Sequence, residues 1–350
     1  MKTTIYSLLA AAACGMAFGQ TTAYTDPVGY LTIPIPGKTL IGDATKLELA
    51  SQGLLPGDAV RFAGVATTAT GTTVTLTGAE WTPSAYVGNF VELTSGPLTG
   101  TFTKITVSTA DALTTEDDIT AAGATPSFRI VKAFTIGTLL GNPPTAAVVA
   151  GGTSSTSADN VLLLNPATGV YDTIWYKNGG VGGTGWRASS TGTALATNNV
   201  IHPSDGLVFQ RKQVGNGSLV VTGSVKTTPT DIWVEGDGLS TKMSILSLQF
   251  PVNQLTLADS GLFTGSATTG VKGGTSATSA DNVLIYDSGT GTYDTIWYKN
   301  GGVGGTGWRA SSTGTANAGP NVIPAGKAVL IQRKAGPSFI WNVPAITVAP

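Results

Sequence analysis

The segment YDTIWYKNGGVGGTGWRASSTGT, Tyr171–Thr193, occurs a second time without a single change at Tyr293–Thr315. The two copies start 122 residues apart. Similarity extends outward from both, because SADNVL precedes each copy, and the FQRK that follows the first returns as IQRK after the second. A repeat of this length is a folding unit rather than a short motif. The chain therefore contains two related units.

The residue pattern inside this segment is typical of a β-strand followed by a turn. From Tyr171 to Tyr176 the side chains would alternate between two faces, and both faces would carry an aromatic residue. Asn178-Gly179 then gives a turn signal. Similar short runs separated by Gly, Pro and Asn recur along the chain, whereas helical periodicity is limited to Asp43–Leu55, where we expect a short helix. We predict an all-β protein.

The stretches that precede the two copies differ in length, which indicates an insertion in the first unit. The inserted segment has a strand pattern of its own, with GTTVTLTG and SFRIV, that suits a small β-barrel. We therefore predict two related β-sandwich-like repeat units, the first interrupted by a small β-barrel. The expected divisions are a signal peptide at 1–19, the first part of unit 1 at 20–55, the inserted barrel at 56–133, the remainder of unit 1 at 134–229, and unit 2 at 230–350.

The first residues read as an export signal. Lys2 precedes the apolar run 5–13, and Ala17-Phe18-Gly19 supplies the small residues of a cleavage site, so we expect cleavage after Gly19. A lipoprotein anchor at Cys14 is the alternative, although Ala11 stands where Leu is usual. No later run is long and apolar enough for a membrane helix. We expect a secreted protein, extracellular or on the outer cell surface, with the periplasm as another possible location.

Composition limits the classes of partner. Only 11% of residues are charged and the formal net charge is −1, so neither nucleic acid nor an anionic membrane surface is an expected partner. The chain has a single cysteine, which lies in the export signal, and 41% of its residues are apolar. We expect the fold to be held by apolar burial without disulfides.

Three longer stretches carry a resemblance to a known group of proteins. They are the opening TDPVGYLTI, the middle EWTPSAYVGNFVELTSGPLTGTFTKIT and the block YDTIWY…GWR…NVI…QRK. Together they resemble an uncharacterised secreted β-rich family found as many paralogues in Verrucomicrobia-type bacteria. The resemblance implies export and a β fold and supplies no catalytic residues. This chain departs from the simplest pattern of the family by carrying the YDTIWY block twice.

Motifs that suggest chemistry have simpler explanations here. Gly180-x-Gly182-x-x-Gly185 spells the dinucleotide fingerprint, but WRASSTGT follows it where a helix would be required, so a glycine-rich hairpin loop is the better interpretation. His202 is the only histidine, and we expect it in an exposed loop. With no cysteine beyond the export signal and no second histidine, we predict no catalytic residues, no metal ligands and no cofactor. Calcium dependence stays open.

The repeated aromatic residues are the remaining candidates for a ligand site. Aromatic platforms on a sheet, with Arg, Asp and Asn nearby, can hold sugar rings, whereas the alternative is that the tryptophans fill the core. The candidate ligand-binding residues are Tyr171, Trp175, Trp186, Arg187, Tyr293, Trp297, Trp308 and Arg309.

These features favour a secreted, non-enzymatic structural or adhesive protein of the cell surface or extracellular matrix. Its partners would be itself or other envelope components. The alternative is a bivalent carbohydrate-binding protein that holds polysaccharide on the repeated Trp and Tyr platforms, because two weak sites in one chain give avidity. The identity of the two copies does not choose between these functions.

Overall fold

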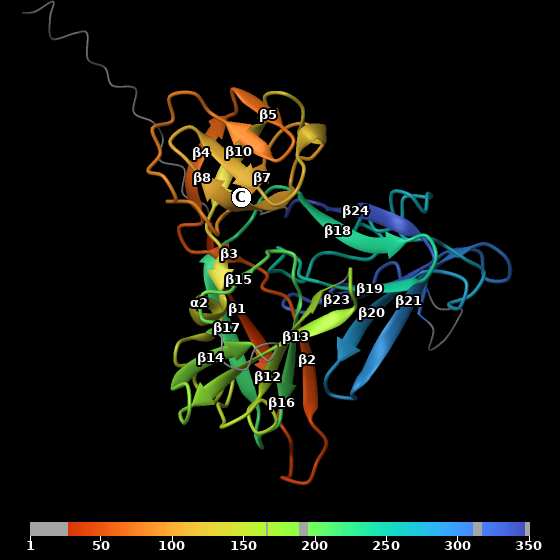
Figure 1. Cartoon of the computed structure of the whole chain (residues 1–350). Coiled ribbons are helices and arrows are strands. Elements are labelled where there is room, and N and C mark those ends of the chain that lie inside the picture. The colour runs from red at the N-terminus through yellow and green to blue at the C-terminus, as the bar shows by residue number, and fades with distance from the viewer. Residues whose placement is uncertain (1–26, 166, 189–194, 311–316, 347–350) are drawn as a thin grey trace, which may run out of the picture.

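The computed structural model describes residues 27–165, 167–188, 195–310 and 317–346. Almost all of its regular structure consists of antiparallel strands, which confirms the all-β fold class (Figure 1). The expected signal peptide at 1–19 lies outside the described residues. No helix among those described is long and apolar enough to span a membrane.

The first unit is a sandwich of two antiparallel sheets around one apolar core. A three-stranded sheet in the order β1-β17-β3 covers one face of a five-stranded sheet in the order β14-β13-β12-β16-β2. Its elements are β1 (Val28–Ile35), β2 (Lys46–Ala50), β3 (Leu55–Pro56), β11 (Phe134–Thr135), α2 (Ile136–Leu140), β12 (Asn160–Asn165), β13 (Val170–Asn178), β14 (Thr184–Ala188), β15 (Val200–Ile201), β16 (Leu207–Arg211) and β17 (Gly217–Ser224).

The second unit has the same layered arrangement. A two-stranded sheet, β18-β24, covers a five-stranded sheet in the order β22-β21-β20-β23-β19. Its strands are β18 (Thr230–Asp237), β19 (Thr241–Leu246), β20 (Asn282–Asp287), β21 (Thr292–Asn300), β22 (Thr306–Ala310), β23 (Val329–Lys334) and β24 (Pro337–Val343). Strand order and register agree with the first unit, since Trp175 pairs with Arg187 in one sheet and Trp297 with Arg309 in the other.

The inserted segment folds around its own core and lies at the top of the molecule in Figure 1. It contains β4 (Val60–Val65), β5 (Thr68–Thr70), β6 (Thr73–Thr75), β7 (Phe90–Leu93), β8 (Phe102–Ser108), β9 (Ala112–Thr115), the 3-10 helix η1 (Thr120–Ala122) and β10 (Ser127–Val131). The strand order is β4-β10-β7-β8-β9-β6-β5, and no ladder of the described residues joins β4 to β5. The predicted small barrel is therefore wrong in this respect, because the sheet stays open.

The segment expected to be a short helix forms a strand instead. Within Asp43–Leu55, residues Lys46–Ala50 form β2, which pairs with β16 at the edge of the sheet. Leu47 and Leu49 follow a spacing of two and reach one apolar cluster between the units. Burial of this two-residue pattern outweighed the helical propensity of the local sequence.

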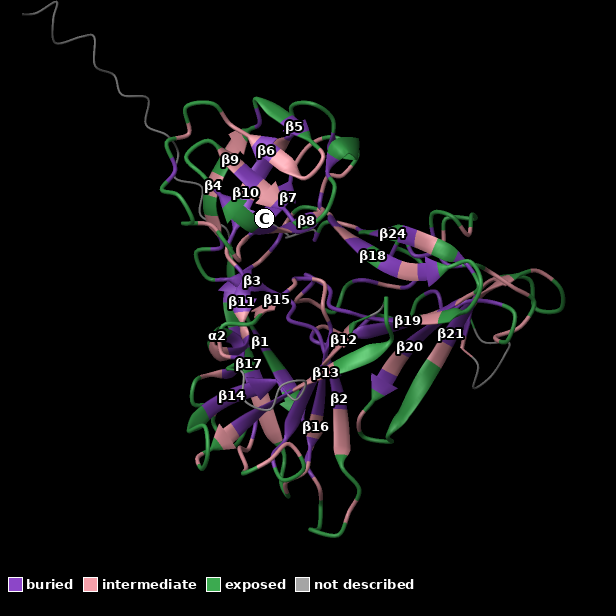
Figure 2. Cartoon of the chain, in the orientation of Figure 1, coloured by how far each residue is buried: buried purple, intermediate pink, exposed green. Residues whose placement is uncertain are grey.

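The two units pack against each other through the outer faces of their five-stranded sheets. The cluster between them contains equivalent residues from both units, namely Leu49 with Ile245, Leu162 with Leu284, and Val208 with Leu330. Figure 2 shows buried residues along β12, β16 and β20, which border this interface.

Polar contacts across this interface are reciprocal. Ala50 forms a bridge to Lys327 and Leu246 forms one to Asp205, which are equivalent pairs. Ser51 and Ser247 hydroxyls lie 3.1 Å apart at the centre. The units thus meet as in an isologous dimer, within one chain.

Polar groups attach the insert to the first unit and to the segment that leads into the second. Glu92 accepts from Arg129 at 2.6 Å and from Lys226 at 2.8 Å, and Lys226 lies just before the second unit. Burial lowers the pKa of Lys226, while the Glu92 charge acts in the opposite direction. His202 is not an exposed loop residue, because its Nε2 donates to the Phe102 carbonyl at 3.2 Å and its ring packs edge-on against Phe90.

Candidate functional site

The charged residues of the repeated motifs form structural anchors. Asp281 and Arg333 make a fully buried ion pair of 2.5 Å, and the backbone N–H groups of Lys272 and Lys334 donate to the same carboxylate. Asp159 and Arg211 occupy the equivalent positions in the first unit, at 3.5 Å. In both copies, this carboxylate is therefore occupied by contacts within the protein.

The four tryptophans of the repeated segment are buried and divide between two faces. Trp186 and Trp308 face their own unit's core, opposite Tyr176 and Tyr298 on the neighbouring strand. Trp175 and Trp297 lie on the other face, opposite Arg187 and Arg309. Exposed fractions are 6% for Trp175, 0% for Trp186, 4% for Trp297 and 4% for Trp308, so none offers an open ring face.

The glycine-rich loop folds back onto these arginines. The Arg187 guanidinium donates to the carbonyls of Gly182 and Gly183, and Arg309 donates to Gly304. Lys177 likewise donates to the Val181 carbonyl in the same loop. The lysine and arginine side chains of the same unit therefore hold the loop through its carbonyl groups. A phosphate-binding loop has the opposite arrangement, because its N–H groups face the ligand.

Tyr171 and Tyr293 are the two predicted site residues that reach solvent. Their exposed fractions are 43% and 41%. Partial burial of the side chain raises the pKa of both phenol groups. At Tyr293, the nearby hydroxyl groups of Tyr171 and Tyr286 raise the pKa further. The aromatic set predicted from the repeats is therefore not assembled on one exposed surface.

The two copies differ in what covers the edge of the core tryptophan. In unit 1 the helix α2 lies over Trp186, whose indole N–H donates to the Gly141 carbonyl at 2.8 Å. A capping box between Thr135 and Thr138 starts that helix. In unit 2 the corresponding segment turns at Gly261, with φ of +73°, and forms no helix.

The two copies also differ in the residue at the position of Gly141, which is a phenylalanine in unit 2. Phe263 stands 122 residues after Gly141 and stacks on Tyr298, with ring centroids 3.4 Å apart. Trp308 meets Tyr298 edge-on at 5.5 Å. For the indole N–H of Trp308, the part of the chain that the structure describes provides no acceptor.

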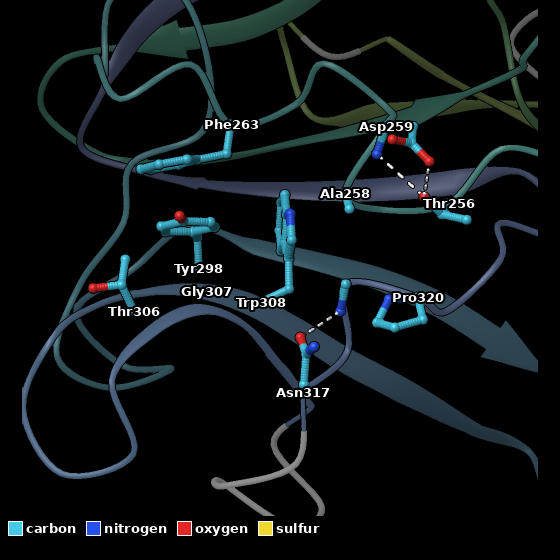
Figure 3. Close-up of a pocket in the computed structure, with 11 residues that line it drawn as sticks. Thr256, Ala258, Asp259, Phe263, Tyr298, Thr306, Gly307, Trp308, Asn317 and Pro320 are labelled. Atoms are coloured by element: carbon cyan, nitrogen blue, oxygen red, sulfur yellow. Dashed lines mark hydrogen bonds between the residues drawn. The ribbon is translucent and has the colours of Figure 1, made fainter.

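A pocket of about 670 Å³ opens where unit 1 has its helix (Figure 3). Figure 3 shows Phe263 above Tyr298 on one side, Asp259 and Pro320 on the other, and Trp308 between them. The lining residues are Thr256, Ala258, Asp259, Phe263, Tyr298, Thr306, Gly307, Trp308, Asn317, Gly319 and Pro320. This hollow combines an aromatic side with exposed hydroxyl, amide and carboxylate groups.

Polar groups at the rim are held in place and keep free hydrogen-bonding capacity. The Thr256 hydroxyl donates to Asp259 Oδ2 at 2.6 Å, which leaves the other carboxylate oxygen to accept. Asn317 accepts from the Gly319 N–H at 3.0 Å through its oxygen, so its amide nitrogen can donate. No lysine or arginine lines the pocket among the described residues.

Of the pocket residues, sequence reasoning had named only Trp308. Phe263 and Asp259 were missed, although one signal could have found them. They lie where two otherwise similar copies diverge, and a change from glycine to phenylalanine between duplicated units is visible in the sequence. Asp172 and Asp294, the repeated carboxylates of the DTIWYK strands, lie on β13 and β21 and do not line this pocket.

A separate surface feature was also missed. Trp233 on β18 is 56% exposed and lies opposite Ile340 on β24, which is 39% exposed. Its indole N–H donates to Glu235 at 2.8 Å. On the equivalent face of unit 1, Tyr30 is 77% exposed and Val220 is 54% exposed. Each outer sheet therefore presents apolar side chains to solvent.

Compared with protein-family models, with curated proteins and with solved structures, the chain matches none of them. Within the described ranges, no group of three or more His, Cys, Asp or Glu residues is arranged to hold a metal ion.

Proposed function

We propose that the chain is an exported, non-enzymatic structural and adhesive protein of the cell surface or extracellular matrix. The observation that carries the proposal is the pair of outer sheets, whose solvent faces expose Tyr30 with Val220 in one unit and Trp233 with Ile340 in the other. Exposed aromatic and aliphatic side chains on the open face of a sheet are candidates for contact with a neighbouring molecule. Two such faces on one molecule can contact two neighbours, either copies of the chain or other envelope components.

The repeated charged motifs support the same proposal. Their carboxylates and guanidinium groups serve buried contacts in both copies, as Asp281 does with Arg333. The reciprocal interface joins the units without a long linker and gives the molecule a fixed spacing between its two outer faces.

Sedimentation velocity of residues 20–350 over a range of concentrations tests this role. We expect the weight-average sedimentation coefficient to rise with concentration, and Trp233→Ser with Ile340→Ser to reduce that rise. Val303→Ser is the matched control, because Val303 is 91% exposed but lies in the glycine loop, away from both outer sheets. A monomer at every concentration would contradict self-assembly.

Carbohydrate binding is the second candidate. The bivalent form of this function would use the repeated aromatic residues, but their tryptophans are at most 6% exposed. The observation that favours binding is the pocket beside Trp308 in unit 2, where unit 1 has the helix α2 over the equivalent Trp186. A single site is the form that this geometry supports.

A further inference from the structure

We propose that the pocket beside Trp308 binds one or two rings of a neutral polysaccharide, and that unit 1 has lost or never had this site. The proposal rests on the second candidate function, carbohydrate binding, and does not depend on self-association.

The indole N–H of Trp308 is the first argument. Trp308 is 4% exposed, yet its N–H has no acceptor within the described chain and is directed to the pocket side. Its equivalent Trp186 donates to Gly141, and the core Trp341 donates to Ser260 at 2.7 Å. The indole N–H groups of Trp81 and Trp297 are also buried without a partner, so a free N–H does not by itself require a ligand. The Trp308 N–H differs from these in facing the pocket, where it can donate to a ligand hydroxyl or ring oxygen.

The aromatic side of the pocket is the second argument. Phe263 and Tyr298 are both partly buried, and their stack beside Trp308 forms an apolar wall. The C–H faces of a pyranose ring are apolar while its edges carry hydroxyl groups. A wall of this kind next to polar groups therefore suits a sugar ring, as small-ligand sites generally combine apolar surface with a few placed polar groups.

The third argument comes from charge. Among the described residues that line the pocket, Asp259 alone is charged, and it accepts hydrogen bonds, as sugar hydroxyls require. Asn317 can donate from its amide nitrogen, and Thr306 adds a hydroxyl at the edge. Since no cation lines the pocket in the described chain, a phosphate, sulfate or uronate would meet a carboxylate without compensation. The ligand is therefore expected to be neutral.

Asymmetry between the units completes the proposal. In unit 1, α2 and the Gly141 carbonyl occupy the equivalent space and satisfy Trp186. In unit 2, the chain turns at Gly261 and Phe263 stacks on Tyr298, so the space beside Trp308 stays open. The difference gives two tryptophans of the same sequence context, one with a ligand site and one without.

The test is isothermal titration calorimetry with residues 20–350 at low protein concentration. The ligands are neutral hexasaccharides of β-1,4-linked glucose, mannose, xylose or N-acetylglucosamine, and of β-1,3-linked glucose. Oligogalacturonate is the anionic comparison. We expect at least one neutral hexasaccharide to bind with one site per chain. Trp308→Phe removes the N–H and keeps most of the ring, and it should weaken binding about tenfold, the effect of one hydrogen bond. Phe263→Gly should weaken it by a similar or larger factor.

Trp186→Phe is the matched control, because it removes the equivalent N–H in unit 1 and should leave the affinity unchanged. Asp259→Asn gives a second variant on an exposed residue, so that loss of binding can be separated from loss of folding. The proposal is overturned by absence of binding to every neutral hexasaccharide, by binding of oligogalacturonate alone, by a stoichiometry of two, or by equal effects of Trp186→Phe and Trp308→Phe. Failure here would leave the sedimentation result, and hence the structural role, unaffected.

Discussion

At the scale of single residues, the same amino acid performs the same task in both copies almost everywhere. Asp159 and Asp281 both pair with an arginine from the QRK motif, and Arg187 and Arg309 both hold the glycine loop. In the sequence, Asp159 stands at the entry to the strand of SADNVL, where an Asx-turn would be enough to explain it. The arginine is more than 50 residues away in the chain, and that distance is why local reasoning missed the pair.

The buried pair in unit 2 gives a prediction about stability. Asp281→Asn removes the charge that compensates Arg333, whose side chain is fully buried, and we expect a loss of about 3–5 kcal/mol in the free energy of unfolding. Asp294→Asn is the control, since Asp294 is exposed, and it should change stability by less than about 0.5 kcal/mol. Urea unfolding followed by fluorescence measures both, and equal effects would show that the Asp281 pair does not stabilise the fold.

At the scale of elements, the alternation in DTIWYK correctly predicted strands, which the structure places at β13 and β21. The sequence could not say which face is inward, because both faces are covered. One faces the core of its own unit, and the other faces the glycine loop or the second unit. The order of strands in the insert depends on contacts distant in sequence, so the open sheet was mistaken for a barrel.

The helix α2 provides a prediction at this scale. Thr135→Ala removes the hydroxyl that accepts from the Thr138 N–H, and it should cost about 1 kcal/mol. Because α2 covers Trp186, we also expect faster hydrogen exchange at the Trp186 indole. Thr256→Ala changes the unit 2 threonine whose hydroxyl likewise accepts the N–H three residues later, that of Asp259, but where no helix follows, and exchange at Trp308 should stay as it is. Indole exchange measured by NMR distinguishes the two cases, and an unaltered rate at Trp186 in Thr135→Ala would contradict the covering role of α2.

At the scale of the whole molecule, two similar units are joined through a reciprocal interface that the repeat alone did not reveal. The sequence showed that the chain contains a duplication, but it contained no signal that the copies would meet face to face. Leu162 and Leu284 look like ordinary strand residues, and only the arrangement of the units brings them into one cluster.

The centre of that interface is tightly packed at Gly206, which leads to a further prediction. A Cβ at this position would lie 2.6 Å from Ile245 Cγ2 and 2.9 Å from the Ala328 Cβ. We expect Gly206→Val to force the units apart and to cost about 1–3 kcal/mol. Gly42→Val, at a position with no atom within 4 Å, is the control. If thermal unfolding shows the same Tm for both variants, the units do not pack as described.

The central claim is that a duplicated scaffold, structural in both copies, has one ligand site, in its second unit. The most direct measurement is titration of ¹⁵N-labelled residues 20–350 with an equimolar mixture of the neutral hexasaccharides, following the indole N–H signals by NMR. The account predicts that the Trp308 signal shifts on addition while the Trp186 signal stays in place. Equal shifts at Trp186 and Trp308, or a Trp308 signal that does not move, would contradict it.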